Sequence, residues 1–246
     1  MEGAEINDPQ QALLSIVLLN VVLVGLTVGV FWAGVFVARS FGWTPGYSLT
    51  PLGFSRPKGG FFAGACIGAL VGAGAVVVSM FVNLASVLVF DRFGYSTERA
   101  IQGPFMRGLV DWVRESPGAA IPAIILVVVI FGPAVEELVF RGAVFNGLYR
   151  LGGLVSGRFG ESKSLGGAVK KASFAFSALS SSAFFALLHR EPVLLPALLI
   201  LAVILCALFE RTGSLLPPFV AHATFNSFTV LLIILAGLGA FEMPSI

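Results

Sequence analysis

Six long runs without a charged residue constrain the fold of this chain more than any other feature. They contain no Asp, Glu, Lys or Arg and cover residues 9–38, 59–90, 116–135, 172–188, 192–209 and 212–241. A helix needs about 20 apolar residues to cross the hydrocarbon core of a bilayer. Because the bilayer offers no water to backbone groups, and because the runs lack strand-like alternation, they are predicted to be transmembrane helices.

The composition agrees with a membrane protein. Hydrophobic residues make up 57% of the chain and charged residues 11%, whereas a soluble domain carries about 25% charge. The net charge of +2 comes without a basic cluster, so the sequence indicates no nucleic-acid partner. We therefore predict an all-α, polytopic bundle of about six to eight transmembrane helices, integral to a lipid bilayer.

One membrane domain over residues 1–246 is predicted, in two parts. Residues 1–118 hold two spans and a charged segment, PFMRGLVDWVRES, that begins at Pro104. On a helix this segment has an apolar side and a charged side, which is typical of a helix lying at the membrane surface, although an ordinary solvated helix has the same pattern. Residues 119–235 hold the motifs described below and form the predicted catalytic core.

Two features predict how the spans are arranged. Gly64, Gly68 and Gly72 recur every four residues, which places a groove of small residues on one helix face for a close neighbour. Six crossings would put both termini on one side of the membrane and the loops at 39–59 and 150–171 on the other. The second loop is rich in Lys and Arg, so that side is predicted to be cytoplasmic.

The apolar stretch at residues 119–150 contains charges where they are expensive. A Gly-Pro step interrupts it, and the segment FGPAVEELVFRG then introduces Glu136, Glu137 and Arg141. On a helix Glu137 and Arg141 are four residues apart and share a face, so an ion pair is expected. Glu136 is rotated by about 100° from Glu137. It has no partner in its own helix, so we expect it either to find one on another helix or to stay protonated.

Two further polar groups interrupt later apolar spans. FFALLH places Phe185 four residues before His189, and HATFN places His222 four residues before Asn226, so each pair shares a helix face. Taken singly, such residues have ordinary explanations: an interfacial histidine, an ion pair at a helix end, or an amide that joins two helices. Ionisable residues on three spans together favour a functional site that faces the bundle interior.

The chemistry that these residues support is hydrolysis. Glu136 would be the base that activates a water, and His189 would be the second anchor of that water. His222 and Asn226 would donate hydrogen bonds to the oxyanion of the tetrahedral intermediate. These four residues are the predicted catalytic group.

Three more residues are predicted to support this group. Glu137 and Arg141 would hold the helix of the first motif in place, and the Phe185 ring would pack beside His189 and fix it.

Several alternatives share the same residues. Glu136, His189 and His222 match the ligand set of many zinc hydrolases, although the HExxH helix is absent, so we favour a site without a cofactor and keep zinc as the alternative. A proton-coupled transporter could relay protons through the same side chains, but the chain shows no inverted internal repeat. A scaffold without catalytic activity is the third possibility.

Taken together, the motifs EExxxR, FxxxH and HxxxN resemble those of the CPBP intramembrane proteases. This family is also called Abi and includes the type II CAAX prenyl endopeptidases. The resemblance covers roughly residues 119–235 and implies a membrane endopeptidase. In that family the first Glu and the His of the second motif are thought to activate water, which corresponds to Glu136 and His189. The His and Asn of the third motif, here His222 and Asn226, would bind the oxyanion.

The resemblance also suggests classes of substrate. Eukaryotic members remove the last three residues of prenylated CAAX proteins, and many bacterial members are linked to processing of peptides or bacteriocins. Older descriptions call the family metalloproteases, which keeps the zinc alternative open. A short chain of this kind resembles the prokaryotic members, so we expect a peptide or lipidated-protein substrate and a location in a prokaryotic plasma membrane.

Overall fold

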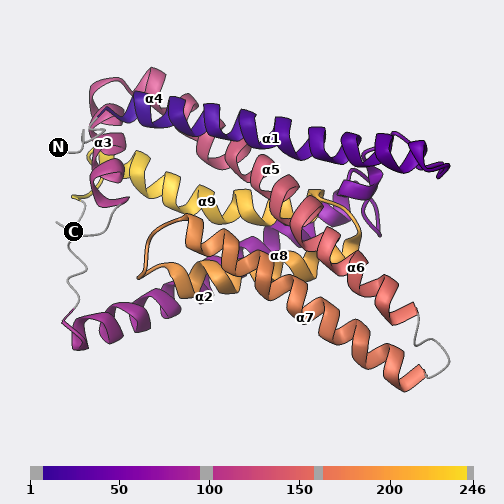
Figure 1. Cartoon of the computed structure of the whole chain (residues 1–246). Coiled ribbons are helices and arrows are strands. Elements are labelled where there is room, and N and C mark those ends of the chain that lie inside the picture. The colour runs from indigo at the N-terminus through magenta and orange to yellow at the C-terminus, as the bar shows by residue number, and fades with distance from the viewer. Residues whose placement is uncertain (1–7, 95–101, 158–162, 243–246) are drawn as a thin grey trace, which may run out of the picture.

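The computed structural model describes residues 8–94, 102–157 and 163–242, and the regular elements in these ranges are all helical (Figure 1). The elements are α1 (Pro9–Ser40), η1 (Thr50–Leu52), α2 (Phe61–Arg92), α3 (Gln102–Glu115), α4 (Pro117–Ile124), η3 (Ile125–Phe131), α5 (Gly132–Glu136), η4 (Glu137–Phe145), α6 (Asn146–Gly157), α7 (Lys163–Leu188), α8 (Leu195–Thr212) and α9 (Leu216–Gly237). η1 is a 3₁₀ turn, whereas η3 and η4 are π-helical. The predicted all-α class is confirmed.

Six helices within the described ranges are long and apolar enough to cross a bilayer. They are Pro9–Ser40, Phe61–Arg92, Pro117–Leu154, Gly166–Leu188, Leu195–Thr212 and Leu216–Gly237. The third is one continuous stretch that runs from α4 to α6, so it crosses once. The chain is an integral, multi-pass membrane protein. The six spans in the described ranges correspond to the lower end of the predicted six to eight.

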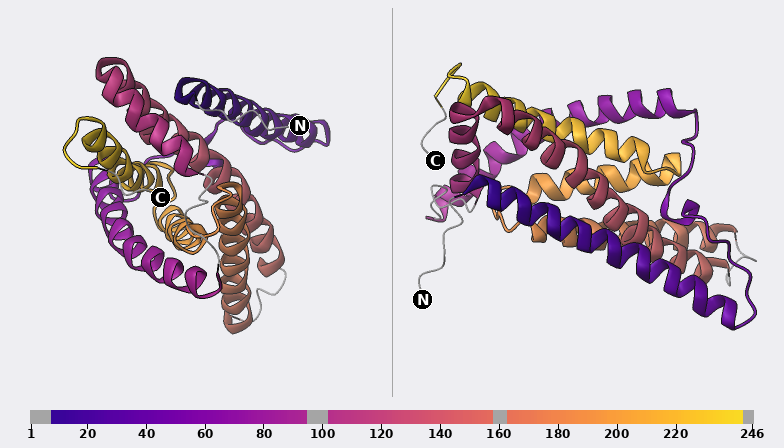
Figure 2. Two further views of the ribbon diagram at one scale, coloured as in Figure 1. Left: turned by 90° about the vertical axis from the view of Figure 1, so that its left-hand side faces the viewer. Right: turned by 90° about the horizontal axis from the view of Figure 1, so that it is seen from above.

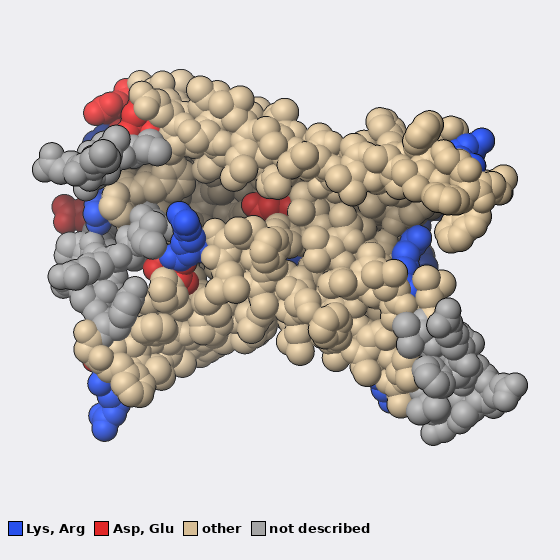
Figure 3. All heavy atoms as spheres, in the orientation of Figure 1, with Lys and Arg blue, Asp and Glu red and all other residues tan. Residues whose placement is uncertain are grey.

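The two ends of the bundle differ from its middle. α1 begins and α9 ends at one end, whereas the loop after α1, the end of α6 and the start of α7 lie at the other (Figure 1). This is the arrangement predicted for six crossings. On the face seen in Figure 3, Lys and Arg side chains gather at the two ends, and a broad belt between them is almost uncharged. Such a belt is what a helix bundle needs where it meets hydrocarbon.

The glycine groove of α2 receives α9. A Cβ atom on Gly68 would lie 2.5 Å from the carbonyl oxygen of Pro217, and one on Gly72 would run into the carbonyl oxygen of Ala221. Two helix backbones can approach this closely only where the interface residues are small. The predicted packing role is confirmed, and the neighbour is the helix that carries His222.

The interruption predicted in the third span takes the form of wide helical turns. The chain stays helical through Gly132 and Pro133, and the π-helical stretches η3 and η4 lie on either side of the short α5. A π-turn closes a hydrogen bond to the fifth preceding residue, so it rotates the following side chains relative to an α-helix and is frequently found at functional sites. Glu136 and Glu137 lie at the junction of α5 and η4.

α3 is amphipathic, as predicted, and its apolar side packs on α9. Leu109 and Val113 are buried, and a Cβ on Gly237 of α9 would overlap Val113. Asp111 and Arg114 are exposed on the opposite side and form an ion pair at 3.1 Å. In Figure 1, α3 lies across the end of the bundle where α1 begins.

α1 lies at the edge of the bundle. In the end-on view of Figure 2 it is set to one side of the other spans, and it packs along the third span and α3. Its outward-facing side chains are large and apolar, such as Val30 and Phe36, which are about 70% exposed. In a membrane protein such side chains face lipid.

The approach of α2 and α9 generates a stability test. An alanine at Gly72 has to push the Ala221 backbone away, and overpacking of this kind costs about 1–3 kcal/mol. Gly74 lies on the same helix with nothing within 4 Å of its Cβ position, so Gly74→Ala is the matched control. We expect Gly72→Ala, but not Gly74→Ala, to lower the melting temperature of the purified protein in detergent. Equal melting temperatures for the two variants would contradict the observed packing.

Candidate active site

A buried ion pair anchors the first motif. Arg141 Nη1 lies 2.9 Å from Glu137 Oε1, and both side chains are 1% exposed, as the spacing predicted. Arg141 also reaches the carbonyl oxygen of Ala202 on α8 at 3.5 Å, and its guanidinium carbon lies 4.7 Å from the centre of the Phe185 ring on α7. Arg141 therefore connects the third span to two neighbouring helices.

Glu137 has a second partner that sequence spacing did not reveal. The same carboxylate oxygen lies 2.8 Å from Nδ1 of His222 on α9. A carboxylate accepts hydrogen bonds, so Nδ1 carries the hydrogen and donates it. This contact fixes the orientation and tautomer of the His222 ring, and it leaves Nε2 to face the opposite side.

Glu136 finds its predicted partner on another helix. Its Oε2 lies 3.7 Å from Nε2 of His222, and 27% of its side chain is exposed, compared with 3% for His222. The separation is too long for a direct hydrogen bond, but a water at an ordinary distance of about 2.8 Å from each atom can contact both. Glu136 is thus the accessible member of the group. Figure 3 shows an acidic patch in the middle of the uncharged belt.

The two acids share one neighbour, which corrects an expectation. Their angular separation on an α-helix predicted that Glu136 and Glu137 would point to different places. Instead they approach the two nitrogens of the same imidazole, His222. Both residues keep α-helical backbone angles, and the imidazole from α9 lies where each carboxylate reaches a different nitrogen. A helical wheel of one span cannot anticipate a ring supplied by another helix.

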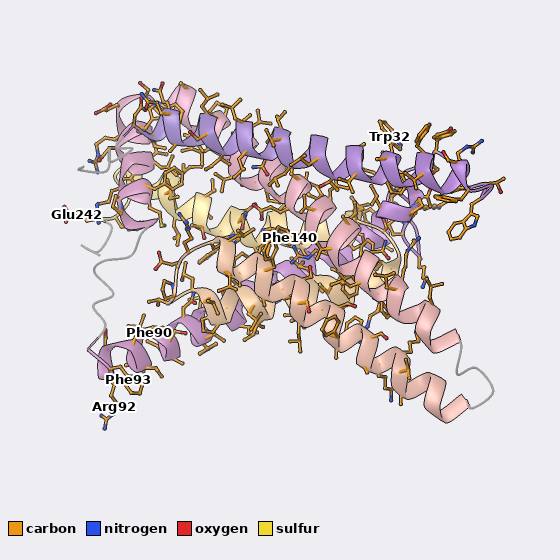
Figure 4. The ribbon with its side chains drawn as sticks, in the orientation of Figure 1. Trp32, Phe90, Arg92, Phe93, Phe140 and Glu242 are labelled. Atoms are coloured by element: carbon orange, nitrogen blue, oxygen red, sulfur yellow. The ribbon has the colours of Figure 1, made fainter. Side chains whose placement is uncertain are left out.

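His189 is held by its own helix end and by Phe185. Its Nδ1 lies 2.8 Å from the carbonyl oxygen of Phe185, and the two rings are 4.6 Å apart, which confirms the predicted packing. The Phe185 ring also meets His222 edge-on, with 5.7 Å between ring centres. Phe140, near the middle of the bundle in Figure 4, packs edge-on against Phe185. One aromatic ring therefore contacts both histidines and Arg141.

Asn226 is engaged with the third span. Its Nδ2 lies 3.0 Å from the carbonyl oxygen of Val128 in η3, and the side chain is part-buried. Because a carbonyl oxygen only accepts, this contact shows which end of the carboxamide faces Val128. Asn226 follows His222 by one helical turn on α9, so the third motif binds the third span at two points: Glu137 through His222, and Val128 through Asn226.

The described residues do not assemble a metal site. No group of three His, Cys, Asp or Glu side chains in these ranges is close enough together to hold a metal ion. Of the zinc ligands considered above, Glu136 and His222 approach each other. His222 donates Nδ1–H to Glu137, and His189 donates Nδ1–H to a backbone carbonyl. A zinc-binding histidine that coordinates through Nε2 usually donates Nδ1–H in the same way, so these two hydrogen bonds are compatible with either type of site.

An apolar cavity of about 610 Å³ lies beside Glu137. Residues of α1, the loop after η1, α5 and the start of α9 line it, and Glu137 contributes to its wall. Ala134, one turn before Leu138, lines it, and so does Arg56 from the loop. The cavity brings an apolar space to the helix that carries the carboxylates.

Comparison with known proteins agrees with the motifs. Residues 118–228 match the family model described as "Type II CAAX prenyl endopeptidase Rce1-like". The resemblance inferred from the three motifs is confirmed over these residues. The Rce1-like region includes the candidate residues from Glu136 to Asn226 and four of the six candidate spans in whole or large part.

A curated relative points in the same direction. The chain is 28% identical over 113 residues to "Putative membrane peptidase YdiL" of Bacillus subtilis. The aligned part is 46% of this chain, and it covers 38% of the length of that relative. No solved structure matches the chain significantly.

The buried pair generates a second stability test. Arg141→Met leaves the Glu137 carboxylate buried without its cation, and breaking such a pair costs about 3–5 kcal/mol. Arg114→Met is the matched control, because the Arg114–Asp111 pair is over 60% exposed and should contribute at most about 1 kcal/mol. Unfolding in mixed micelles measures the difference. The assignment of Arg141 as the anchor is wrong if both variants lose stability equally.

Proposed function

We propose that the chain is an intramembrane endopeptidase in which the Glu136 carboxylate activates a water held beside His222. The observation that carries the proposal is the 3.7 Å approach of Glu136 Oε2 to His222 Nε2, with the opposite nitrogen of the ring held by Glu137. An accessible carboxylate provides a base for the water, and the fixed imidazole beside it provides a donor for the oxyanion that forms when the water attacks. The match of residues 118–228 to the Rce1-like family supports the same activity.

The proposed reaction begins with proton transfer. Glu136 takes a proton from the water, and the resulting hydroxide oxygen bonds to the carbonyl carbon of the scissile peptide. The carbonyl oxygen becomes an oxyanion, and collapse of the tetrahedral intermediate breaks the C–N bond. The proton held by Glu136 then goes to the leaving amine, so that one water is consumed for each bond cleaved.

His222 and Asn226 are the proposed donors to the oxyanion. To donate, His222 must carry a proton on Nε2 in addition to the one on Nδ1, and the carboxylate of Glu137 at 2.8 Å offsets the positive charge on the ring. This is the role that the buried Asp plays in a Ser-His-Asp triad. His189, with Nδ1 committed to Phe185, has Nε2 as its acceptor, and we propose it as the second anchor of the water.

We propose that the site works without a metal cofactor. The lack of a three-ligand group among the described residues supports this type. Zinc-dependent hydrolysis by the same residues is the alternative. Metal analysis of the purified protein separates them: stoichiometric zinc that is lost together with activity on chelation would show the metallo type.

The proposed substrate is a membrane-associated peptide or lipidated protein. The cavity beside Glu137 is bounded mainly by apolar side chains, which suit an apolar or lipid-carrying substrate. CAAX-type prenylated proteins and bacteriocin-like peptides are the two classes to compare. A prokaryotic plasma membrane is the proposed location, and the Bacillus relative supports it.

Glu136→Gln tests the proposed activity. The amide keeps the shape of the side chain but cannot take a proton, so cleavage should fall by about 10²–10⁴-fold, the usual contribution of a general base. Glu115→Gln, an exposed acid at the end of α3, is the control and should cleave normally. Cleavage is measured with purified protein in liposomes that contain quenched-fluorescent lipidated peptides.

The same pair of variants separates the competing functions. A transporter would show pH-coupled flux but no cleavage in wild-type liposomes, and the flux would be lost in Glu136→Gln. Identical behaviour of wild type and Glu136→Gln in both assays would indicate a scaffold and would contradict the proposed chemistry.

A further inference from the structure

The backbone before Pro133 leaves one carbonyl group without its usual helical donor. In η3 the hydrogen bonds span five residues, and the N–H of Gly132 donates to the carbonyl of Val127. The next bond in this series would run from residue 133 to the carbonyl of Val128. Proline has no N–H, so that bond cannot form. In an α-helix the N–H of Gly132 would donate to the carbonyl of Val128. Here that N–H donates to the carbonyl of Val127 instead.

Asn226 takes the position of the missing donor. Its Nδ2 lies 3.0 Å from the Val128 carbonyl oxygen and comes from α9, 98 residues away in sequence. A buried carbonyl without a partner is costly, so the absence of an N–H at Pro133 favours this contact over rotation of the amide. Nδ2 carries two hydrogens. One is used by Val128, and the second is fixed in direction by the first.

We propose that Pro133 is a positioning residue for the oxyanion donor Asn226. By withholding an N–H from Val128, it makes that carbonyl hold the carboxamide in one orientation, with the second N–H of Nδ2 directed to the oxyanion. This inference rests on the proposed function, because it assigns a direction to a donor of that reaction. Pro133 itself contacts neither water nor substrate in this account.

Pro133→Ala restores the missing donor. The new N–H competes with Asn226 for the Val128 carbonyl, and alanine is a better helix former than proline, so the helix should be retained. We expect kcat to fall about 10- to 100-fold, as for a misdirected catalytic group, with KM unchanged because the oxyanion does not exist in the bound substrate. Pro122→Ala, inside α4 of the same span, is the matched control and should leave both constants unchanged.

A double-mutant cycle tests whether Pro133 acts through Asn226. Asn226→Ala removes the donor and should lower kcat by about 10²–10³-fold. If Pro133 acts only by orienting Asn226, the Pro133→Ala/Asn226→Ala double variant is no slower than Asn226→Ala alone. Additive losses would overturn the proposal, because Pro133 would then influence the reaction by another route.

A spectroscopic readout keeps the inference testable without activity. In protein labelled with ¹⁵N-asparagine, the side-chain amide signal of Asn226 is identified by its absence from Asn226→Ala. We expect it to shift in Pro133→Ala and to stay in place in Pro122→Ala. An unshifted signal in Pro133→Ala overturns the inference. A shifted signal in a protein whose wild type cleaves no peptide contradicts the proposed function alone.

Discussion

The buried chain of contacts from Arg141 through Glu137 to His222 is the interaction on which the rest of the site depends. It joins η4 to α9 through two short polar contacts, 2.9 Å and 2.8 Å, within an almost fully buried environment. Charges placed in a membrane-spanning helix are expensive unless they are paired. Here the pairing fixes the histidine ring, and the fixed ring in turn gives Glu136 a defined neighbour.

Apolar packing determines whether this polar chain can form. Gly68 and Gly72 let α9 approach α2, and α9 carries both His222 and Asn226. Phe185 fills the space between the two histidines and the guanidinium group of Arg141. Buried hydrogen bonds and ion pairs stabilise a protein only when packing keeps their partners in good geometry. The small residues and the aromatic ring thus contribute to function through position alone.

Much of this arrangement follows from sequence because it depends on local spacing. The apolar runs predict the spans, the four-residue spacing predicts the Glu137–Arg141 pair, and the same spacing predicts that Phe185 packs against His189. The contacts of His222 with Glu137 and of Asn226 with Val128 join residues 85 and 98 positions apart, so no periodicity in a single helix indicates them. The convergence of both acids on one ring depends on the placement of His222 by α9, which the geometry of the third span alone does not predict. The catalytic roles of these residues stay predictions.

The tautomer of His222 is the measurement that tests the central claim most directly. The chain has two histidines, so ¹⁵N-histidine labelling gives two sets of ring signals, and a His189→Gln variant assigns them. The account predicts that Nδ1 of His222 is protonated and that this proton is hydrogen-bonded to the carboxylate of Glu137. A His222 ring with an unprotonated Nδ1 would contradict it, because Glu137 could then not be the group that turns Nε2 toward Glu136.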